Sequence, residues 1–264
     1  MDQPLILAEA PWLGPALALG FGLAFGSFTN VLICRLPLHK SVVFPPSACP
    51  HCGGLIRPYD NVPILSYIFL LGRCRQCKTG ISPRYPFVEA VVGAASLYAY
   101  LRHGLSLELF CEVGFVVAMV ALVFIDYDHR ILPNVITLPG TAAGLLLAWP
   151  RETISVTEAL LGAALGAGLL FLVSEVYFRL RSIEGLGMGD IKMMGMVGAF
   201  LGWKGVLLTL FMGSFVGSII GLGLMVAWGK DLKSALPFGT FLGIAAVATL
   251  YVGPNLVEWY SGFF

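Results

Sequence analysis

The sequence predicts an all-α polytopic membrane protein with about eight transmembrane helices and one small cytoplasmic, zinc-ribbon-like domain. Three observations support this class. Of the 264 residues, 58% are hydrophobic, and the mean hydropathy is +0.86. Charged residues make up 12%, about half of the roughly 25% that is usual in soluble domains. Apolar runs also recur along the chain, several of them near the roughly 20 residues that a helix needs to cross a bilayer.

The first predicted element, within residues 1–34, is an apolar run from Trp12 to Cys34 that is long enough to cross the membrane. The residues before it lack the positive charge of a signal peptide, so we expect this run to be a retained span. Its end is polar, with Ser27, Thr29 and Asn30. Such side chains are more typical of hydrogen bonding between membrane helices than of chemistry.

Residues 35–86 have a different composition and are predicted to form the small cytoplasmic domain. They contain Pro45 and Pro46, two C-x-x-C pairs and a single acid, Asp60. The stretch 61–71 is apolar but too short to span, so we expect an interfacial or core segment there. Against the one acid stand seven basic residues: Arg35, Lys40, Arg57, Arg73, Arg75, Lys78 and Arg84.

The cysteine pairs of this domain have the spacing of a metal site. Cys49, Cys52, Cys74 and Cys77 form C-x2-C-x21-C-x2-C, in which two turns each offer two thiolates to one tetrahedral ion. A reducing cytosol disfavours disulfides. The spacing therefore predicts a structural Zn²⁺ bound by these four residues, with a redox pair or simple structural cysteines as the alternatives.

Residues 87–264 are predicted to form a seven-helix membrane core. Several of its helices contain small residues four apart, which lets membrane helices approach closely. The segment 190–203 is short, and whether it crosses fully is open. The seven apolar runs lie at about 86–101, 107–126, 133–149, 156–178, 190–203, 205–228 and 237–257.

The distribution of basic residues predicts the orientation. With eight spans both termini lie on one side, and lysine and arginine concentrate in cytoplasmic loops. Placing the cysteine-bearing loop in the cytosol puts 13 of the 16 basic residues inside. Both termini are then outside, and Asp126 and Asp190 lie on the cytoplasmic side.

These two aspartates are the candidates for catalysis because each stands at the end of an apolar run. Asp126 follows the run 113–125, and Asp190 opens the run 191–200. A carboxylate at the centre of a bilayer costs roughly 2.5–3.5 kcal/mol, so an acid in such a place is expected to have a function and a partner. The pair therefore suggests a shared site.

The glycines before Asp190, at positions 185, 187 and 189, remove side chains beside its carboxylate. A substrate backbone or a second helix can then approach closely. The alternative is that Asp190 is only the N-cap of a helix, a common role for aspartate after glycine. Nothing in the sequence shows that the two aspartates meet.

If they do meet, acid–base chemistry follows. Two carboxylates about 4 Å apart repel by roughly 4 kcal/mol at an effective dielectric constant of about 20, so they would share one proton near neutral pH. One activates water and the other protonates a peptide carbonyl, as in aspartic proteases. Asp128 is the rival of Asp126, but we expect it to lie in a loop beside Arg130.

Several stretches in order along the chain resemble the type IV prepilin peptidases. They are Gly26-Ser-Phe-Thr-Asn30 through Arg35-Leu-Pro37, the two C-x-x-C pairs, Tyr59 to Tyr67, Gly72 to Arg75, Arg84 to Glu89, Asp126 to Asn134, Gly187-Met-Gly-Asp190 and Pro237-Phe-Gly239. The resemblance covers nearly the whole chain. Thr29 and Cys34 depart from the apolar or aromatic residues that we expect there.

The resemblance implies a bacterial inner-membrane aspartic endopeptidase of the G-x-G-D type whose active site faces the cytoplasm. It implies cleavage of the leader peptide of prepilins and type II secretion pseudopilins, then N-methylation of the new N-terminal residue with S-adenosylmethionine. The family's catalytic aspartates fall on Asp126 and Asp190. No Gly-rich dinucleotide-binding motif marks a site for the methyl donor.

Three alternative functions stay open on the sequence alone. The chain could be a peptidase without methyltransferase activity. It could also be a transporter in which Asp126 and Asp190 bind protons or cations, or an assembly scaffold that docks through the zinc domain. Partners are expected to be pilin-like substrates and the lipid bilayer. No basic helix or aromatic-rich RNA motif argues for nucleic acid.

Overall fold

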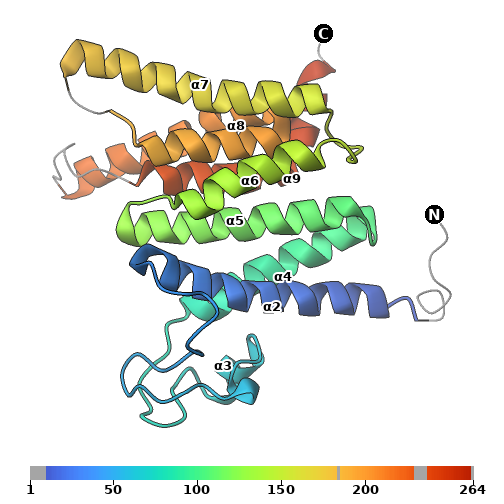
Figure 1. Cartoon of the computed structure of the whole chain (residues 1–264), viewed down its shortest axis with the longest axis vertical. Coiled ribbons are helices and arrows are strands. Elements are labelled where there is room, and N and C mark those ends of the chain that lie inside the picture. Colours follow the sequence, from blue (N-terminus) through green and yellow to red (C-terminus); the bar gives the residue numbers. More distant parts are fainter. Residues whose placement is uncertain (1–9, 183–184, 229–236, 263–264) are drawn as a thin grey trace. The chain divides into compact units, whose positions relative to one another are not determined.

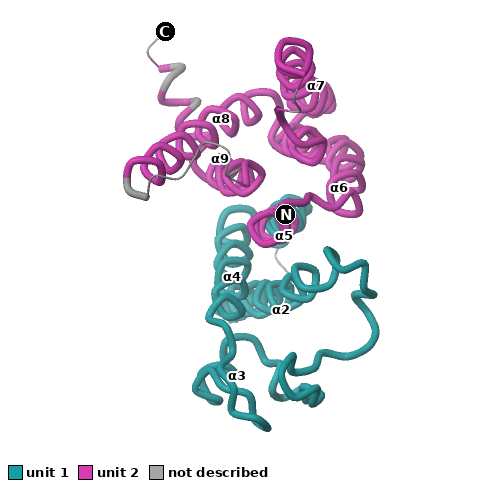
Figure 2. Tube along the Cα trace, turned by 90° about the vertical axis from the view of Figure 1, so that its left-hand side faces the viewer, with its two compact units in different colours: residues 1–117 teal, residues 118–264 magenta. Residues whose placement is uncertain are grey.

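The computed structural model describes residues 10–182, 185–228 and 237–262. It divides into two compact units, Met1–Val117 and Ala118–Phe264, coloured separately in Figure 2. The division falls inside helix α5 (Leu107–His129), which begins in unit 1 and ends in unit 2. The three-part division at residues 34/35 and 86/87 follows composition rather than compactness, and it stays a prediction.

Unit 1 contains two long helices that pack closely, α2 (Leu13–Arg35) and α4 (Arg84–His103). Small residues allow the approach. A Cβ atom added at Gly22 would lie 2.9 Å from Gly93 Cα, and one added at Gly26 would lie 2.6 Å from Glu89 Cα. Ser96 Oγ also donates to the carbonyl oxygen of Ala18 at 2.7 Å. Glycines four apart on α2 thus bring the start of α4 against it.

The chain between α2 and α4 forms short turns and helices only. These are η1 (Leu36–Leu38), η2 (Pro58–Asp60) and α3 (Leu65–Phe69), together with two isolated antiparallel bridges. The described part of the chain contains no named β-strand. With five residues, α3 is far too short to span, as expected for the stretch 61–71.

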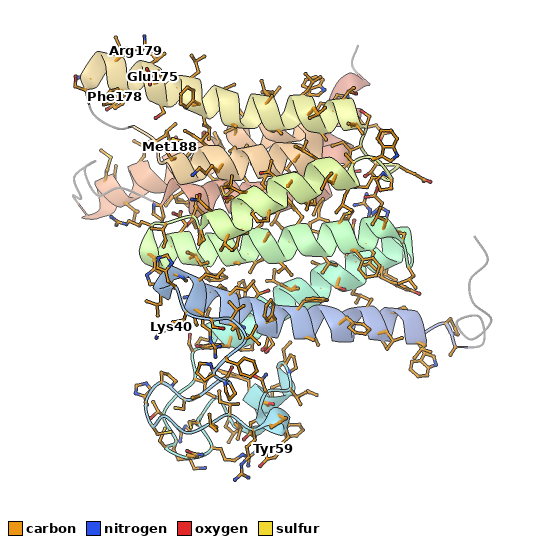
Figure 3. The ribbon with its side chains drawn as sticks, viewed as in Figure 1. Lys40, Tyr59, Glu175, Phe178, Arg179 and Met188 are labelled. Carbon is orange, nitrogen blue, oxygen red and sulfur yellow. The ribbon has the colours of Figure 1, made fainter. Side chains whose placement is uncertain are left out.

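Unit 2 holds α6 (Asn134–Leu147), α7 (Val156–Arg181), α8 (Met188–Trp228) and α9 (Phe238–Ser261), labelled in Figure 1. Helix α7 begins with a capping box made by Ser155 and Glu158. Near its other end Arg179 Nε donates to Glu175 Oε1 at 2.7 Å (Figure 3), an i,i+4 ion pair on the helix surface.

Helix α8 folds back on itself at Gly202, whose φ of 69° lies in a region that favours glycine. A straight helix would separate residues 190 and 213 by about 35 Å. Yet Asp190 contacts Gly239, and Gly213 contacts Leu242, one turn further along α9. The two arms of α8 are therefore antiparallel (Figure 1), and they correspond to the predicted segments 190–203 and 205–228.

The predicted count of eight spans is not confirmed. Among the described residues, five helical stretches are long and apolar enough to cross a membrane: Leu13–Leu38, Leu107–His129, Val156–Arg181, Met188–Val226 and Phe238–Leu256. Helix α6 is apolar, but its 14 residues extend only about 21 Å against a hydrocarbon core of about 30 Å. Helix α4 carries a buried glutamate and three tyrosines, which lower its mean hydropathy.

Candidate active site and metal centre

Asp126 lies near the end of α5 and is buried, with 5% of its surface exposed. One carboxylate oxygen, Oδ2, accepts two hydrogen bonds from Thr240, at 2.7 Å from the backbone N–H and at 3.0 Å from the hydroxyl. Thr240 is in the first turn of α9. N–H groups in a first turn have no partner within their helix and favour negative charge. Asp126 therefore occupies the anion-binding end of α9.

Asp190 lies in the first turn of α8, and its Oδ1 is buried with no hydrogen-bond partner. Gly239, in the first turn of α9, lies beside both acids. A Cβ atom added at Gly239 would lie 2.9 Å from Asp190 Oδ1 and 3.0 Å from Asp126 Oδ2. The distance between Asp190 Oδ1 and Asp126 Oδ2 is therefore at most the sum of these two distances, about 5.9 Å. A water that hydrogen-bonds to both, at about 2.8 Å each, can bridge such a gap.

The glycines before Asp190 differ in what lies beside them. Within 4 Å, a Cβ atom added at Gly187 would meet only Asp190 Oδ2 and the backbone N of Gly189. The space beside Gly189 is filled by Leu132, whose Cβ would be 2.8 Å from an added Cβ. Leu132 also reaches Gly239, where an added Cβ would lie 2.9 Å from its Cδ1. Gly189 therefore lets Leu132 pack against the start of α8. The N-cap interpretation of Asp190 is also wrong, because Asp190 follows Met188 and Gly189 inside the helix.

Asp128 requires a second correction, because it does not lie in a loop. Helix α5 continues to His129, so Asp128 is in its last turn. Two residues on an α-helix turn through about 200°, which places Asp126 and Asp128 on opposite faces. Asp126 is buried and Asp128 is exposed. The two acids differ in burial because they lie on opposite faces of α5, and not because the helix ends between them.

No sequence pattern marks Thr240, and Gly239 is marked only by the family resemblance. Both sit 114 or so residues from Asp126 along the chain, so no local pattern connects them. One weak signal exists: Pro237 directly precedes a run of apolar residues, as prolines often do at helix starts. That signal locates the N-terminus of α9 but not what it binds.

The four cysteines of the two C-x-x-C pairs come together as predicted. Their sulfur atoms all lie within 4.8 Å of one another, and Cys49 Sγ is 3.8 Å from Cys77 Sγ. With metal–sulfur bonds of about 2.3 Å, a tetrahedral zinc ion holds its sulfur ligands about 3.8 Å apart. The cluster can therefore hold a metal ion of the kind that thiolates select.

The two cysteine turns have the same backbone geometry. In the first, Cys49 N–H donates to Gly54 O, and Gly53 N–H donates back to Cys49 O. In the second, Cys74 and Lys78 make the same bonds, to Thr79 O and Cys74 O. Each turn is closed by an antiparallel bridge, and its fifth residue has a positive φ, 68° at Gly53 and 59° at Lys78. Two equivalent turns thus face one another across the sulfur atoms.

Hydrogen bonds in the turns favour thiolate, the form that binds metal, at two of the four cysteines. Hydrogen bonding with the Thr79 side chain, and then with its backbone N–H, lowers the pKa of Cys77 to about 6. Backbone N–H groups of Cys52 and His51 lower the pKa of Cys49. The pKa of Cys52 is instead raised to about 11, because a lowering hydrogen bond from the Gly54 backbone is outweighed by burial and by the neighbouring Cys49 and Cys77 thiols. One thiolate from each turn is thus available to a divalent ion before it binds.

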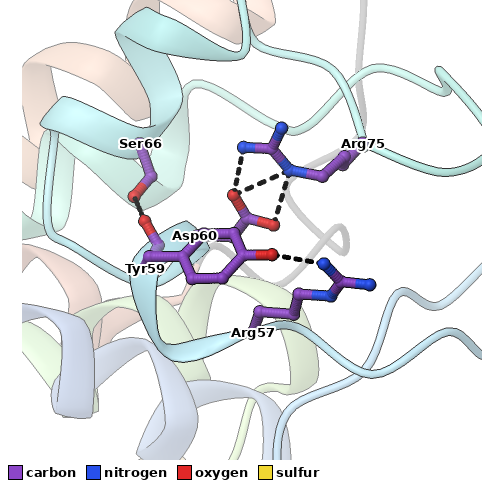
Figure 4. A network of polar contacts seen from close by, with 5 residues as sticks. All are labelled: Arg57, Tyr59, Asp60, Ser66 and Arg75. Carbon is purple, nitrogen blue, oxygen red and sulfur yellow. Dashed lines mark hydrogen bonds and ion pairs between the residues drawn. The ribbon is translucent and has the colours of Figure 1, made fainter.

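Between the turns, a polar network fixes η2 against the second turn (Figure 4). Asp60 accepts hydrogen bonds from Arg75 Nη2 at 2.6 Å and Nε at 2.9 Å, which lower the pKa of Asp60. The Tyr59 ring lies 5.6 Å from the Arg75 guanidinium and 5.8 Å from that of Arg57, while Ser66 donates to the Tyr59 carbonyl. These contacts replace the hydrophobic core that such a short segment lacks.

Comparison with known proteins places these features in a family. Residues 21–103 match the bacterial peptidase A24 N-terminal domain, and residues 113–222 match the type IV leader peptidase family. This chain belongs to the type IV leader peptidase family. The first match contains the four cysteines and α4, and the second contains Asp126 and Asp190.

Relatives that carry the name prepilin leader peptidase/N-methyltransferase are similar over most of this chain. The protein of Legionella pneumophila is 32% identical over 98% of both chains, and that of Aeromonas hydrophila is 33% identical over 95% of this chain and 94% of its own. The protein of Myxococcus xanthus is 40% identical over 83% of this chain and 66% of its own. No solved structure gave a significant match.

Proposed function

We propose that this chain is an aspartic endopeptidase that removes the leader peptide of prepilins and pseudopilins and then methylates the new N-terminal residue. The observation that carries the peptidase half is the meeting of Asp126 and Asp190 around Gly239. The names of relatives similar over nearly the full chain support both halves.

The surroundings of the two acids suggest different roles for them. Asp126 accepts two hydrogen bonds from Thr240 at the N-terminus of α9, which stabilise a carboxylate. Asp190 has a buried oxygen with no partner, a cost that a proton on this carboxyl and a bound substrate would remove. Asp126 then takes a proton from the attacking water, and Asp190 gives one to the peptide carbonyl.

The bridging water would attack the scissile carbonyl between the two acids. Proton transfer from water to Asp126 yields hydroxide as the nucleophile, and proton transfer from Asp190 neutralises the developing oxyanion. The two acids then exchange roles. Asp126 gives its proton to the leaving amine, and Asp190 takes back a proton as the carbonyl re-forms. Because like charges within about 6 Å repel by roughly 3 kcal/mol or more at an effective dielectric constant of about 20, a state with one shared proton is favoured at neutral pH.

The proposed location is the bacterial cytoplasmic membrane, with the acids and the cysteine-bearing segment at its inner face. Support comes from the apolar helices and from the basic residues concentrated in residues 35–86. A pilin-like substrate would keep its basic leader in the cytosol while its apolar helix lies among the membrane helices. Both acids sit at ends of helices, where a scissile bond at the membrane edge can reach them.

The metal is proposed to be a structural Zn²⁺ bound by Cys49, Cys52, Cys74 and Cys77. Four thiolates fill a tetrahedral ion, so no position is left for water or substrate. S-adenosylmethionine is the proposed methyl donor. The metal would stiffen the segment that joins α2 to α4, and this segment needs such a link because it contains few buried apolar residues.

The test of the peptidase proposal is replacement of the acids one at a time. Asp126→Asn and Asp190→Asn keep the side-chain shape, and each is expected to abolish detectable cleavage, since general acid–base groups contribute about 10²–10⁴-fold. Asp128→Asn, on the opposite face of α5, is the matched control and should cleave at close to the wild-type rate. Product mass after incubation with a synthetic prepilin is the measurement.

The same variants separate the two activities when they receive a peptide that lacks the leader. Both should still add a methyl group to it, because the proposed dyad has no part in methyl transfer. A result in which Asp128→Asn is inactive while Asp126→Asn cleaves normally would assign catalysis to the other face of α5.

A further inference from the structure

A cavity of about 660 Å³ lies within unit 1, between the end of α2, the start of α4 and the cysteine-bearing segment. Its size is within the range of about 300–1,000 Å³ that is usual for small-molecule sites. The walls include Cys49 and Cys74, so the proposed metal site borders the cavity. The described residues that line it run from Ser27 to Glu89, and all belong to unit 1.

Glu89 is a buried acid in the wall of this cavity, with 8% of its surface exposed. Its Oε2 accepts a hydrogen bond from the Ile64 N–H at 2.8 Å. This donor is neutral. Within residues 10–182, 185–228 and 237–262, no arginine, lysine or histidine forms an ion pair with it. Among the described residues, no cationic side chain therefore balances a negative charge on Glu89.

The other acid of the cavity differs in this respect. Asp60 also lines the wall, but the Arg75 guanidinium holds both of its oxygens (Figure 4). Arg75 thus neutralises Asp60 and leaves Glu89 as the acid available to a ligand. Burying an unpaired carboxylate is costly, so a cationic ligand at this position gains affinity from the existing charge.

The same cavity offers a positive charge as well. Arg35 lines it, and its guanidinium donates to the backbone carbonyls of Ser41 at 3.0 Å and Pro45 at 2.7 Å. Neutral carbonyls orient the guanidinium without cancelling its charge. Tyr67 and Tyr85 add aromatic surface to the wall. A ligand that carries both charges and a flat ring system therefore matches what the lining offers.

We propose that this cavity binds S-adenosylmethionine, with Glu89 balancing the positive charge of the donor and Arg35 available to its carboxylate. The inference rests on the proposed methyltransferase half and assigns its donor site to unit 1. The donor carries a sulfonium, an ammonium and a carboxylate, together with an adenine that can pack on tyrosine.

Binding of two ligands that differ in charge tests this assignment. The full-length protein, purified with zinc in detergent, is titrated calorimetrically with S-adenosylmethionine and with S-adenosylhomocysteine, which lacks the sulfonium charge. The variants are Glu89→Gln and, as a matched control, Glu112→Gln. Glu112 is an equally buried glutamate of unit 1, but it pairs with His103 at 2.8 Å and does not line the cavity.

Glu89→Gln keeps an oxygen to accept from Ile64 and removes only the charge. We expect it to weaken S-adenosylmethionine binding by about tenfold to a hundredfold, as for loss of one charge-assisted contact, and to weaken S-adenosylhomocysteine binding less. Glu112→Gln should bind both ligands as wild type does. Ultraviolet cross-linking of radiolabelled donor should mark a peptide between residues 27 and 89.

Several results would overturn the assignment. Equal loss for both ligands would mean that Glu89 acts through the shape of the cavity and not through charge. Unchanged binding of both, with a raised KM for the leaderless peptide, would assign Glu89 to the amine of that substrate. A cross-linked peptide from residues 118–264 would move the donor site to unit 2. Prepilin cleavage, measured on the same samples, reports separately on Asp126 and Asp190, so failure of the peptidase proposal is distinguishable.

Discussion

The acid pair of unit 2 and the cysteine cluster of unit 1 are both small sites, but they are held in place by opposite means. Asp126 and Asp190 lie in terminal turns of long helices, and Gly239 of a third helix packs beside both of them. The cysteines lie on two turns in a segment whose longest helix has five residues. Helix packing fixes the first site, whereas the second is held by its turns, by the Asp60–Arg75 ion pair and, as proposed above, by metal ligation.

This difference decides how each site should fail. A site built on packed helices tolerates loss of exposed contacts but not added volume, because its neighbours cannot move. A site built on turns tolerates added volume and fails when its cross-link is removed. The predictions below test this contrast in both directions.

The largest effect is expected for Gly239→Ala. The new methyl group would lie 2.9–3.0 Å from Asp190 Oδ1, Leu132 Cδ1 and Asp126 Oδ2, so one of the three has to move. Cleavage of a synthetic prepilin should fall by about 10²–10⁴-fold, as if an acid had been lost. Gly168→Ala is the control, since an added Cβ there meets nothing within 4 Å. A Gly239→Ala enzyme of normal rate would show that the close approach of α9 is dispensable.

Removal of the proposed metal should affect unit 1, which holds the four cysteines. After chelation, or with Cys74→Ser, we expect methylation to fall more than about tenfold and cleavage less than about twofold, because thiolate ligation holds the two turns together. Both activities are followed by product mass, and metal content is measured on the same samples. Equal loss of the two activities would contradict the independence of the sites.

Thr240→Val should have an intermediate effect. It removes the hydroxyl that donates to Asp126 at 3.0 Å and keeps the backbone N–H bond at 2.7 Å. Loss of one hydrogen bond to a charged group costs about 1.5–3 kcal/mol, or about ten- to a hundredfold in cleavage rate. Thr249→Val, on the same helix and also buried, removes a bond to Thr209 instead and should keep the rate. Equal effects of the two would indicate a general loss of packing.

The smallest effect concerns Asp60, whose pKa is lowered by Arg75. A lowered pKa means that the pair stabilises unit 1 above the unfolded value of about 3.9 and ceases to do so as the pH falls through the folded value. Asp60→Asn should therefore unfold slightly earlier than wild type at pH 7 in scanning fluorimetry. The difference between the unfolding temperatures of the two proteins should shrink as the pH falls. A difference that grows would show that the Asp60–Arg75 pair is not its cause.

Sequence patterns marked the candidate site residues but not the contacts between them. The cysteine spacing and the two acids beside apolar runs were visible because each is a local feature. The Gly239–Thr240 contact was not, since hydrogen bonds to Asp126 across 114 residues leave no periodic trace. The environment of Asp128 was misjudged because polarity suggested a loop, whereas the helix continues through it to His129.

The predicted spans illustrate a similar limit. Hydropathy marked the break near residue 203 correctly, since Gly202 and Lys204 interrupt the apolar run. It did not distinguish α6, whose composition suits a membrane but whose 14 residues do not reach across one. Nor did composition indicate that unit 1 extends to Val117, inside a continuous helix.

The reversal at Gly202 determines on which side of unit 2 the chain leaves α8. Because the two arms of α8 are antiparallel, the chain leaves this helix on the side where it entered, and α9 starts level with Asp190. An uninterrupted rod of 41 residues would deliver the start of α9 about 60 Å away along its axis. Thr240 could then not reach Asp126. The positive φ of Gly202, a residue distant from both carboxylates, thus determines whether α9 can lie beside them.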